Sequence, residues 1–352
     1  MSNAKKKVFV GMSGGVDSSV SAALLLEQGY DVTGVFIKVW QPDFIECTWK
    51  QDRLDALRVA AKLGIPFVTL DLEKEYKQGV IDYMIEEYRA GRTPNSDVMC
   101  NREVKFGAFW EWAKDQGADY IATGHYAQIS QNSTKHPLCL VKSSDGNKDQ
   151  TYFLWTLTSS DLSHTLFPVG GMQKEDVRKE AEKRGLATST KKDSQGLCFV
   201  GTIDIKTLLK TFIQEERGEV KNIQGETIGI HDGVTFYTIG ERHGFTITKK
   251  SIDEKPYFIV AKDLSQNVLV VSQVPPQEIE GATISLIRTT WTRPITQGDV
   301  YEARARYRAP LAKVRVENET TVSVVEGDIT AVKGQSLVLY DGDTCIGGGI
   351  IA

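Results

Sequence analysis

Short apolar runs alternate with amphipathic stretches over residues 7–123, and this alternation constrains the fold more than any other feature of the sequence. We expect strands at 7–12, 32–39, 66–72 and 119–123, and helices at 17–28, 51–63, 73–90 and 102–116. Strands separated by helices pair in parallel, because a helical crossover returns the chain to the end of the sheet from which it left. The sequence therefore predicts an α/β fold that begins with a Rossmann-like domain around a parallel sheet.

Helical spacing also predicts the apolar faces of two of these helices. In the first, over 51–63, five apolar residues fall largely on one face: Leu54, Leu57, Ala60, Ala61 and Leu63. In the second, over 73–90, five others recur at helical spacing: Val80, Ile81, Met84, Ile85 and Tyr88. A further helix, highly charged and therefore solvated, is expected over 174–184.

Beyond residue 205 the pattern changes to short β-rich runs separated by glycine and aspartate turns. We expect strands at 234–239, 257–260, 268–271, 303–307, 321–325 and 336–340. Pro275 and Pro276 interrupt this region, because proline cannot donate to a β-ladder. The predicted organisation is an α/β domain over 1–205, a small β-rich central domain over 206–274 and a C-terminal β-barrel-like domain over 275–352.

Composition excludes several classes of protein. With 352 residues, of which 41% are hydrophobic and 25% charged, the chain suits two or three globular domains. The formal net charge of -4 argues against a surface that is basic throughout, but it is compatible with local cationic patches. No apolar stretch approaches the roughly 20 residues of a membrane-spanning helix, and none near the N-terminus suits a signal peptide, so we expect a cytoplasmic protein without membrane contact.

The segment 11–19 reads Gly-Met-Ser-Gly-Gly-Val-Asp-Ser-Ser and lies between the first expected strand and the first expected helix. Glycines let the backbone fold tightly around an anion, and amides and hydroxyls at a helix N-terminus donate to phosphate oxygens. Asp17 adds a carboxylate, which beside a pyrophosphate would hold Mg²⁺. A shorter string of this kind could be explained without a ligand, as a tight turn followed by a helix cap. The whole string in this position predicts a phosphate-binding loop, although it lacks the ending of a Walker A loop.

Further strings follow in order along the chain. They read Gly-Arg-Thr-Pro-Asn-Ser-Asp-Val-Met-Cys-Asn at 91–101, Ala-Asp-Tyr-Ile-Ala-Thr-Gly-His-Tyr at 118–126, Lys-Asp-Gln-Thr-Tyr-Phe-Leu at 148–154 and Gly-Leu-Cys-Phe at 196–199. The segment 11–19 resembles the PP-loop of the ATP pyrophosphatases, and the ordered set, from residue 11 to residue 349, resembles the MnmA-type tRNA 2-thiouridylases. The resemblance implies that ATP adenylates the 2-oxygen of the wobble uridine of tRNA. Sulfur from a cysteine persulfide then replaces that oxygen, giving 2-thiouridine, AMP and pyrophosphate.

The resemblance also implies which residues make each subsite. For ATP they are Gly11, Met12, Ser13, Gly14, Gly15, Val16, Asp17, Ser18, Gly124 and the backbone at Ile37. For the target base they are Asn95, Ser96 and Asp97, and for the rest of the tRNA they are Lys148, Asp149, Gln150, Arg306 and Tyr307. The implied cofactors are ATP and Mg²⁺, and the implied partners are a tRNA with a wobble uridine and a persulfide sulfur donor.

Five widely spaced cysteines contain no CxxC pair, which argues against a disulfide framework and against a CxxC zinc or iron–sulfur site. Sulfur transfer needs a thiolate. Cys100 lies just before the helix expected from residue 102, with Arg102 and Lys105 nearby, and Cys198 follows Lys191. Both settings are therefore expected to favour a thiolate. The resemblance assigns the persulfide to Cys198 and makes Cys100 a partner nucleophile, able to form a disulfide with it; the spacing alone does not distinguish them. The remaining cysteines are read as small apolar residues: Cys47, Cys139 and Cys345.

Asp97, three residues before Cys100, is read through the resemblance as a general acid or base at the uridine. Without the resemblance, a turn or helix-capping aspartate would be the preferred interpretation. Ser96 stands where the family usually has proline, which loosens the segment that presents Asp97. For His125 we expect a structural role or a polar contact at the mouth of the ATP pocket.

A tRNA substrate requires cations for its phosphates even in an acidic protein. Residues 281–315 contain seven lysines or arginines against two acids. Arg304, Arg306 and Arg308 alternate, so on the strand expected there they would share one face as a cationic stripe, with Tyr307 on the opposite face or at a strand end. Residues 174–192 are a second, weaker source of positive charge.

Two other functions remain open at this point. One is a PP-loop enzyme that adenylates a small-molecule carbonyl; the pair of Cys100 and Cys198 weighs against it. The other is an RNA-binding protein that keeps a nucleotide pocket without catalysis; the presence of Asp17 and both cysteines weighs against that.

Overall fold

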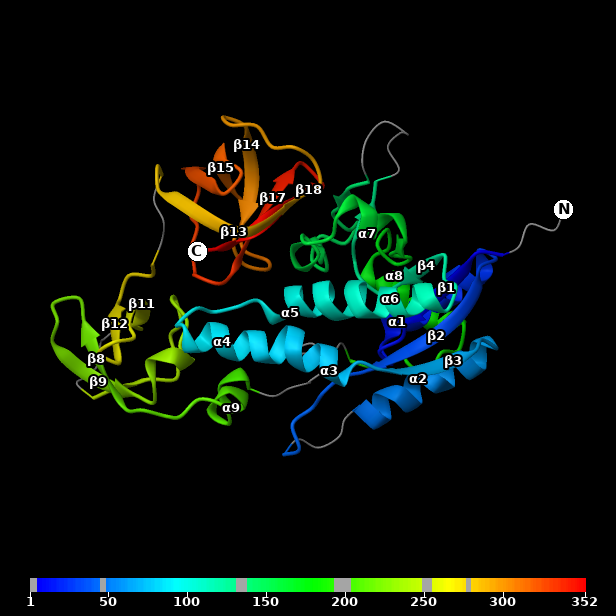
Figure 1. Cartoon of the computed structure of the whole chain (residues 1–352), viewed down its shortest axis with the longest axis horizontal. Coiled ribbons are helices and arrows are strands. Elements are labelled where there is room, and N and C mark those ends of the chain that lie inside the picture. Colours follow the sequence, from blue (N-terminus) through cyan, green and yellow to red (C-terminus); the bar gives the residue numbers. More distant parts are fainter. Residues whose placement is uncertain (1–4, 45–48, 131–137, 193–203, 249–254, 277–279) are drawn as a thin grey trace.

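The computed structural model describes residues 5–44, 49–130, 138–192, 204–248, 255–276 and 280–352. Within these ranges the strands form three sheets: a parallel one near the N-terminus, a mixed one in the middle and an antiparallel one that contains the C-terminus. Figure 1 shows the parallel sheet at one end of the molecule and the two other sheets at the opposite end, one above the other.

The N-terminal sheet has five strands in the order β3-β2-β1-β4-β7, and every neighbouring pair is parallel. The strands are β1 (Lys7–Gly11), β2 (Asp31–Lys38), β3 (Phe67–Asp71), β4 (Tyr120–Ala122) and β7 (Thr165–Leu166). The predicted parallel α/β domain is confirmed, and its four expected strands all form. β7 was not expected, because two residues are too few to show a periodicity.

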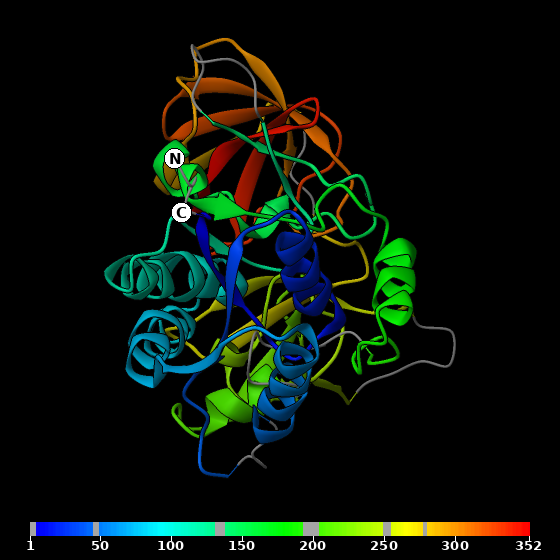
Figure 2. The ribbon, with the colours of Figure 1, turned by 90° about the vertical axis from the view of Figure 1, so that its right-hand side faces the viewer.

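Helices cover both faces of this sheet. Val8 and Val10 of β1 belong to the core cluster shared with α1 (Val16–Glu27), α2 (Trp49–Leu63) and α8 (Lys174–Lys183), whereas Phe9 belongs to the opposite cluster. This is the two-residue alternation of a strand that is buried on both faces. Figure 2 shows the helices on either side of the sheet.

The expected apolar face of α2 is correct at Ala60, which is buried, and wrong at Leu54 and Leu57. The helix buries Ala56, Val59 and Ala60, while Leu54 and Leu57 are 38% and 36% exposed. Small side chains face the sheet because they allow α2 to pack close to β2. The contact between α2 and the sheet is therefore not made by the leucines.

Two long helices form a hairpin beside the sheet (Figure 1). The first runs without a break through α3 (Glu73–Tyr76), η1 (Lys77–Asp82) and α4 (Tyr83–Arg89), and it buries the five predicted apolar residues. The second runs through α5 (Ser96–Met99), η2 (Cys100–Ala108) and α6 (Phe109–Asp115). It starts at Ser96 rather than near Arg102, because the Asn95 side chain caps it by accepting from the Val98 amide at 3.3 Å.

The middle sheet follows the helix α9 (Ile205–Lys210) and has the order β10-β9-β8-β12-β11. Its strands are β8 (Gly218–Asn222), β9 (Thr227–His231), β10 (Thr246–Ile247), β11 (Phe258–Asp263) and β12 (Val268–Ser272). The strand expected at 234–239 is wrong: Val234–Phe236 is the 3₁₀ turn η4, which follows Gly233 with a φ of 146°. A backbone in that conformation cannot continue a strand.

Six antiparallel strands close into a barrel at the C-terminal end, in the order β13-β16-β15-β14-β17-β18 with β13 paired to β18. They are β13 (Thr283–Trp291), β14 (Val300–Arg304), β15 (Ala312–Asn318), β16 (Thr321–Glu326), β17 (Ser336–Asp341) and β18 (Thr344–Ile351). The predicted barrel is therefore confirmed. β5 (Gln128–Ile129) and β6 (Leu140–Val141) extend the sheet beyond β18, so a segment of the N-terminal half pairs with the barrel.

Two short helical elements lie between β6 and β7: η3 (Thr151–Phe153) and α7 (Ser159–Ser163). Within the described ranges, no helix combines the length and apolar character required to cross a bilayer.

Candidate functional site

The order of the parallel strands fixes where a ligand can bind. From β1 the chain passes to β2 on one side, whereas β4 pairs with β1 on the other side. Ligands of open parallel sheets bind where the direction of the strand order changes, outside the carboxyl ends of the strands. Here that place is formed by the segment after Gly11 and the segment after Ala122, with Ile37 near the carboxyl end of β2.

Gly124 lies directly against the start of α1. A Cβ atom at this position would lie 2.6 Å from the Ser18 amide nitrogen and 2.8 Å from the Asp17 carbonyl carbon. Only glycine permits that approach. The structure thus brings Gly124 together with the predicted phosphate loop, which agrees with a shared nucleotide site.

The loop itself is held by its own hydroxyl groups. The hydroxyls of Ser18 and Ser19 donate to the Gly15 carbonyl at 3.2 and 2.7 Å, and the Ser13 amide donates to the Ser18 hydroxyl at 3.3 Å. Gly14 has a φ of 75°, and a Cβ there would lie 2.3 Å from the Asp52 carbonyl oxygen. The loop is therefore preformed, with Ser13 exposed at its surface and Ser19 fully buried.

Asp17 lies in the first turn of α1, and its carboxylate is bound by groups from two distant segments. Lys174 Nζ donates to the two carboxylate oxygens at 2.7 and 2.8 Å, and the Tyr126 hydroxyl donates to Oδ1 at 2.7 Å. Sequence analysis did not single out either partner. Tyr126 could have been found from the sequence, because it follows a strand that ends at the site. Lys174 is the first residue of the segment 174–192, noted as a weaker source of positive charge, but nothing in the sequence pointed to its contact with Asp17.

This arrangement bears on the expected Mg²⁺. Magnesium usually binds through one or two carboxylates together with substrate phosphates and water. Among the described residues no group of three His, Cys, Asp or Glu side chains could hold a metal. Because an ammonium already bonds both oxygens of Asp17, this carboxylate fits a lysine better than a metal ion in this structure.

Asp97 and Cys100 lie three residues apart in the helix that starts at Ser96, and this spacing places them on one side of it. Cys100 is fully buried. The predicted reason for a thiolate at Cys100 is wrong, because the residue lies inside the helix and not before its first turn, where the amides point outward. Arg102 is also paired, with Glu103 at 3.2 Å.

Cys198, the expected persulfide residue, lies outside the described residues, as does Cys47. The described residues before Cys198 are tied to α2: Lys191 Nζ bonds Asp52 at 2.7 Å and Asp55 at 2.8 Å. Lys191 is therefore already neutralised by two carboxylates, and the cationic setting expected from it for Cys198 is weakened accordingly.

Both β-domains hold the segment that leads into Asp97. The Thr93 amide donates to the Lys333 carbonyl at 2.8 Å, and the Gln335 side chain donates to the Thr93 carbonyl at 2.9 Å. The Thr93 hydroxyl also hydrogen-bonds the Thr238 hydroxyl at 3.0 Å. Residues from the barrel and from the central domain thus fix the entry to the helix that bears Asp97, a convergence that no single motif reveals.

Aromatic residues link the same helix to the barrel. Asn101, next to Cys100, donates from its side chain to the Phe153 carbonyl at 3.0 Å, and the Phe153 ring packs against Tyr307 with ring centroids 4.6 Å apart. The Tyr152 hydroxyl bonds the carbonyls of Ala305 and Ser336, both at 3.1 Å. The structure therefore brings Tyr307 close to the Asp97–Cys100 helix.

The segment 148–150 is stabilised by hydrogen bonds that its own side chains form. Asp149 is 4% exposed, and its carboxylate accepts from the Ser143 amide at 3.1 Å and the Thr151 hydroxyl at 2.9 Å. Gln150 exchanges hydrogen bonds with Tyr126: its side chain accepts from the Tyr126 amide and its amide donates to the Tyr126 carbonyl, both at 2.9 Å. In this structure the side chains of Asp149 and Gln150 shape the segment.

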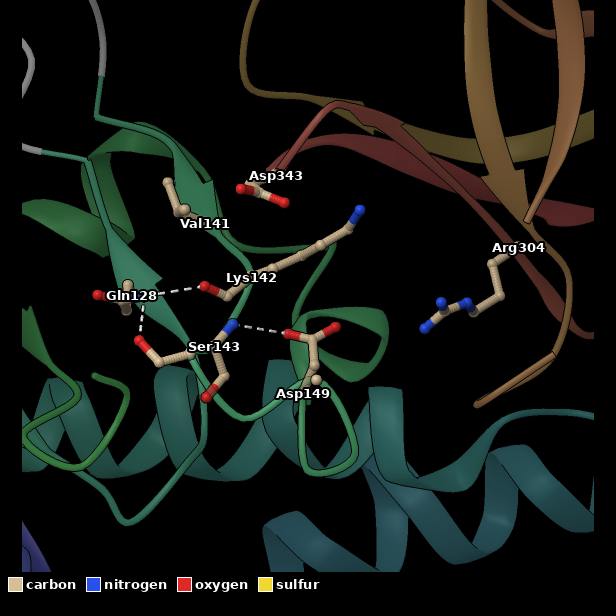
Figure 3. A pocket seen from close by; sticks show the side chains of 9 residues that line it. Gln128, Val141, Lys142, Ser143, Asp149, Arg304 and Asp343 are labelled. Atoms are coloured by element: carbon tan, nitrogen blue, oxygen red, sulfur yellow. Dashed lines mark hydrogen bonds between the residues drawn. The ribbon is translucent and has the colours of Figure 1, made fainter. Parts of the chain in front are cut away.

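The expected cationic stripe is wrong, because β14 ends at Arg304 and the three arginines diverge. Arg304 enters a cavity of about 430 Å³ beside Lys142, Asp149 and Asp343 (Figure 3), and its buried Nε has no hydrogen-bond partner among the described residues. Arg306 is exposed and directed toward Gly240, whereas Arg308, with a φ of 60°, donates to the Asn147 carbonyl at 2.8 Å.

For two residues the structure agrees with the non-catalytic interpretation made from the sequence. His125 is buried, its Nδ1 lies 2.8 Å from the Thr123 hydroxyl, and burial lowers its pKa well below the ordinary value, so it has a structural role. Cys345 is 1% exposed, and burial raises the pKa of its thiol to about 12, which keeps it protonated at neutral pH.

Comparison with known proteins divides the chain at similar places. Residues 6–202 match the model described as tRNA methyl transferase HUP domain, residues 206–273 the tRNA methyl transferase PRC-barrel domain and residues 282–351 the aminomethyltransferase beta-barrel domain. The chain is 46% identical to the tRNA-specific 2-thiouridylase MnmA of Streptococcus mutans serotype c, over 99% of this chain and 96% of that one. The MnmA of Listeria welshimeri serovar 6b is 47% identical, over 99% and 95%.

Proposed function

The chain belongs to the MnmA family of tRNA-specific 2-thiouridylases, and from this premise we propose that it replaces the 2-oxygen of the wobble uridine of tRNA with sulfur at the expense of ATP. As an enzyme it is then a tRNA-uridine sulfurtransferase. The observation that carries the proposal is the match over 99% of the chain to relatives of that name, together with a preformed phosphate loop at the switch point of the sheet.

The first half-reaction activates the base. The uridine 2-oxygen bonds to the α-phosphorus of ATP, the bond from that phosphorus to the bridging oxygen breaks, and pyrophosphate leaves with the electron pair. Backbone amides of the loop after Gly11 and at the start of α1 would bind the phosphates. Asp97, in the first turn of its helix, is the proposed acceptor of the proton that the base loses. Mg²⁺ is proposed to enter with ATP.

The second half-reaction transfers sulfur. The terminal sulfur of a persulfide on Cys198 attacks C2 of the base, and AMP leaves with the former 2-oxygen. The Cys100 thiolate then attacks the Cys198 sulfur, which releases 2-thiouridine and leaves a Cys100–Cys198 disulfide. An external thiol must reduce that disulfide, and a sulfur donor must restore the persulfide before the next cycle.

Recognition of the RNA is assigned to groups from the N-terminal domain and from the barrel. Asn95, Ser96 and Asp97 would contact the target base, and Lys148, Arg306 and Tyr307 the remaining tRNA. The proximity of Tyr307 to Phe153, and of Phe153 to Asn101, supports this assignment because it brings the RNA-facing residues to the helix that bears Cys100. Asp149 and Gln150 are proposed to act by shaping their segment. We propose that the domains span residues 1–205, 206–274 and 275–352, and that the reaction takes place in the cytoplasm.

The test is direct thiolation. The protein is incubated with ATP, Mg²⁺, a persulfide donor and an unmodified tRNA that has a wobble uridine, and the nucleosides are analysed by mass spectrometry. We expect 2-thiouridine, with AMP and pyrophosphate in equal amounts. Absence of a thiolated base, under conditions in which a known thiouridylase works, would refute the proposal.

The same assay distinguishes the other candidates. The description of the matching N-terminal model names methyl transfer, so a methylated base formed in a parallel reaction that also contains a methyl donor, with no thiolated base in the first, would favour that activity. Pyrophosphate release with a small carbonyl compound in the absence of tRNA would favour the small-molecule enzyme. Binding of ATP and tRNA without any product would favour a non-catalytic RNA-binding protein.

A further inference from the structure

The phosphate loop has no cation of its own. Residues 11–19 contain one charged side chain, the carboxylate of Asp17. A nucleotide triphosphate brought to this loop would meet a like charge, and the repulsion is strong where water is partly excluded. A neighbouring cation that offsets this charge would therefore favour the binding of phosphate groups.

Lys174 is that cation. Its ammonium bonds both oxygens of Asp17, at 2.7 and 2.8 Å, and its side chain is 11% exposed against 28% for Asp17. The Tyr126 ring lies 5.6 Å from Lys174 Nζ, which adds a favourable cation–π contact. The ammonium of Lys174 thus neutralises the carboxylate of Asp17 while the lysine side chain stays largely buried.

The position of Lys174 is fixed by its backbone as well. It is the first residue of α8, and its amide donates to Asp145 Oδ2 at 3.0 Å. Asp145 is 7% exposed, and its other oxygen accepts from the Asn147 amide at 3.1 Å. The lysine is therefore supported by the same loop that leads to Lys148, one of the residues assigned to tRNA.

We propose that Lys174 is a phosphate-binding catalytic residue of the nucleotide site, held in readiness by Asp17, which acts as its positioning residue. The inference rests on the proposed use of ATP. As the bond between the α-phosphorus and the bridging oxygen breaks, negative charge collects on the departing pyrophosphate, and the ammonium of Lys174 stabilises it. The lysine donates hydrogen bonds and transfers no proton, so the balance of the reaction is unchanged.

The first test measures binding in the absence of tRNA and of divalent ions. Affinities for inorganic pyrophosphate and for a non-hydrolysable ATP analogue are determined by calorimetry for the wild type, Lys174→Met, Lys174→Arg and Lys179→Met. Lys179 is the matched control, since it lies on the same helix but is 70% exposed and paired with Asp176. We expect Lys174→Met to bind pyrophosphate about tenfold to a hundredfold more weakly, Lys174→Arg to recover part of the loss and Lys179→Met to match the wild type.

Asp17→Asn separates phosphate binding from a merely structural ion pair. If Lys174 binds phosphate, Asp17→Asn retains or improves pyrophosphate affinity because the like charge is gone, and the double variant Asp17→Asn/Lys174→Met, which leaves no unpaired charge to disturb folding, stays weak. A structural ion pair predicts instead that both single variants lower the melting temperature alike and leave the pyrophosphate affinity of the folded protein unchanged. That result overturns the inference.

The outcome also distinguishes this inference from the proposed function. A wild type that thiolates tRNA, together with a folded Lys174→Met that binds pyrophosphate and the analogue normally, refutes the role of Lys174 alone. A wild type that binds neither compound, without Mg²⁺ and again with it, refutes both.

Discussion

Single residues in this protein are constrained by backbone space and by charge. Glycine is required at position 14 for two reasons: its φ is positive, and the Asp52 carbonyl lies where the Cβ of a side chain would be. Lys262 shows the effect of charge: its ammonium donates to the Tyr237 carbonyl at 2.6 Å in a half-buried position near Glu241. Each feature leads to a measurable consequence.

Gly14→Ala is expected to lower the free energy of unfolding by about 2 to 4 kcal/mol, because the strain of a positive φ adds to a steric clash. Gly29 is the control: its φ is 87°, but a Cβ there would meet nothing within 4 Å, so Gly29→Ala should cost only about 1 to 2 kcal/mol. Chemical denaturation measures both variants. Equal losses would contradict the role assigned to the Asp52 contact.

Lys262 predicts a pH dependence of stability. Burial lowers its pKa from an ordinary 10.5 to about 8, so between these values the unfolded chain holds a proton that the folded chain has released. Stability contributed by this residue therefore rises with pH from about 8 to 10.5 and is lowest below pH 8. Over this interval, the melting temperature of the wild type should rise relative to that of Lys262→Met. A difference independent of pH would contradict the shift.

Among the elements, the helix from Ser96 to Asp115 contributes most to the site. It carries Asp97 and Cys100, starts at the cap formed by Asn95 and has the π-type segment η2 immediately after Met99. π-type turns are uncommon and occur often at functional sites. Its entry is fixed by the barrel and by the central domain, so the geometry of Asp97 depends on elements more than 140 residues later in the chain.

Cys100 and Cys345 offer a matched pair, since both are buried, at 0% and 1% exposure. Alanine at either position removes a sulfur of similar packing value, so both variants should lose about 1 kcal/mol of stability. We expect only Cys100→Ala to abolish multiple-turnover thiolation, while adenylation measured by pyrophosphate release continues. Mass spectrometry of the tRNA checks this. Normal thiolation by Cys100→Ala, or its loss in Cys345→Ala, would refute the assignment.

At the scale of the whole molecule, the two β-domains and the parallel-sheet domain meet at the segment that leads into Asp97. The barrel contributes Arg304 and Tyr307, the strands β5 and β6 add to its sheet, and the loop 143–150 connects it to the phosphate site through Tyr126. The acidic net charge does not exclude RNA binding, because single cations such as Lys142 and Arg304 line a cavity beside the barrel.

If Arg304 in the cavity of Figure 3 binds a backbone phosphate, as we propose, Arg304→Gln is expected to weaken tRNA binding by about tenfold. It should also reduce the slope of log affinity against log salt by about one. Arg315, exposed on β15 of the same barrel, is the control. Filter binding over a salt series checks both variants while ATP affinity is followed in parallel. A loss for Arg315→Gln as large as that for Arg304→Gln would indicate general charge attraction only.

Some features are determined by the sequence alone. The parallel sheet follows from strands and helices that alternate, and the phosphate loop follows from glycines and hydroxyls between a strand and a helix; both depend on residues that are near one another in the chain. The barrel was predictable in kind, but the face of α2, the start of the helix at Ser96 and the directions of Arg304, Arg306 and Arg308 were not. These depend on a cap, a strand end or the space left by a neighbour.

Only the tertiary structure brings Lys174 to Asp17, across 157 positions of sequence, and Gln335 to Thr93, across 242. Local patterns report the period of an element and the conformations that its residues tolerate. Which charges meet is decided when α8 packs on α1 and the barrel closes over the hairpin, because burial penalises any charge left without a partner. The phosphate loop was therefore predictable from the sequence, and the contact of its Asp17 with Lys174 was not.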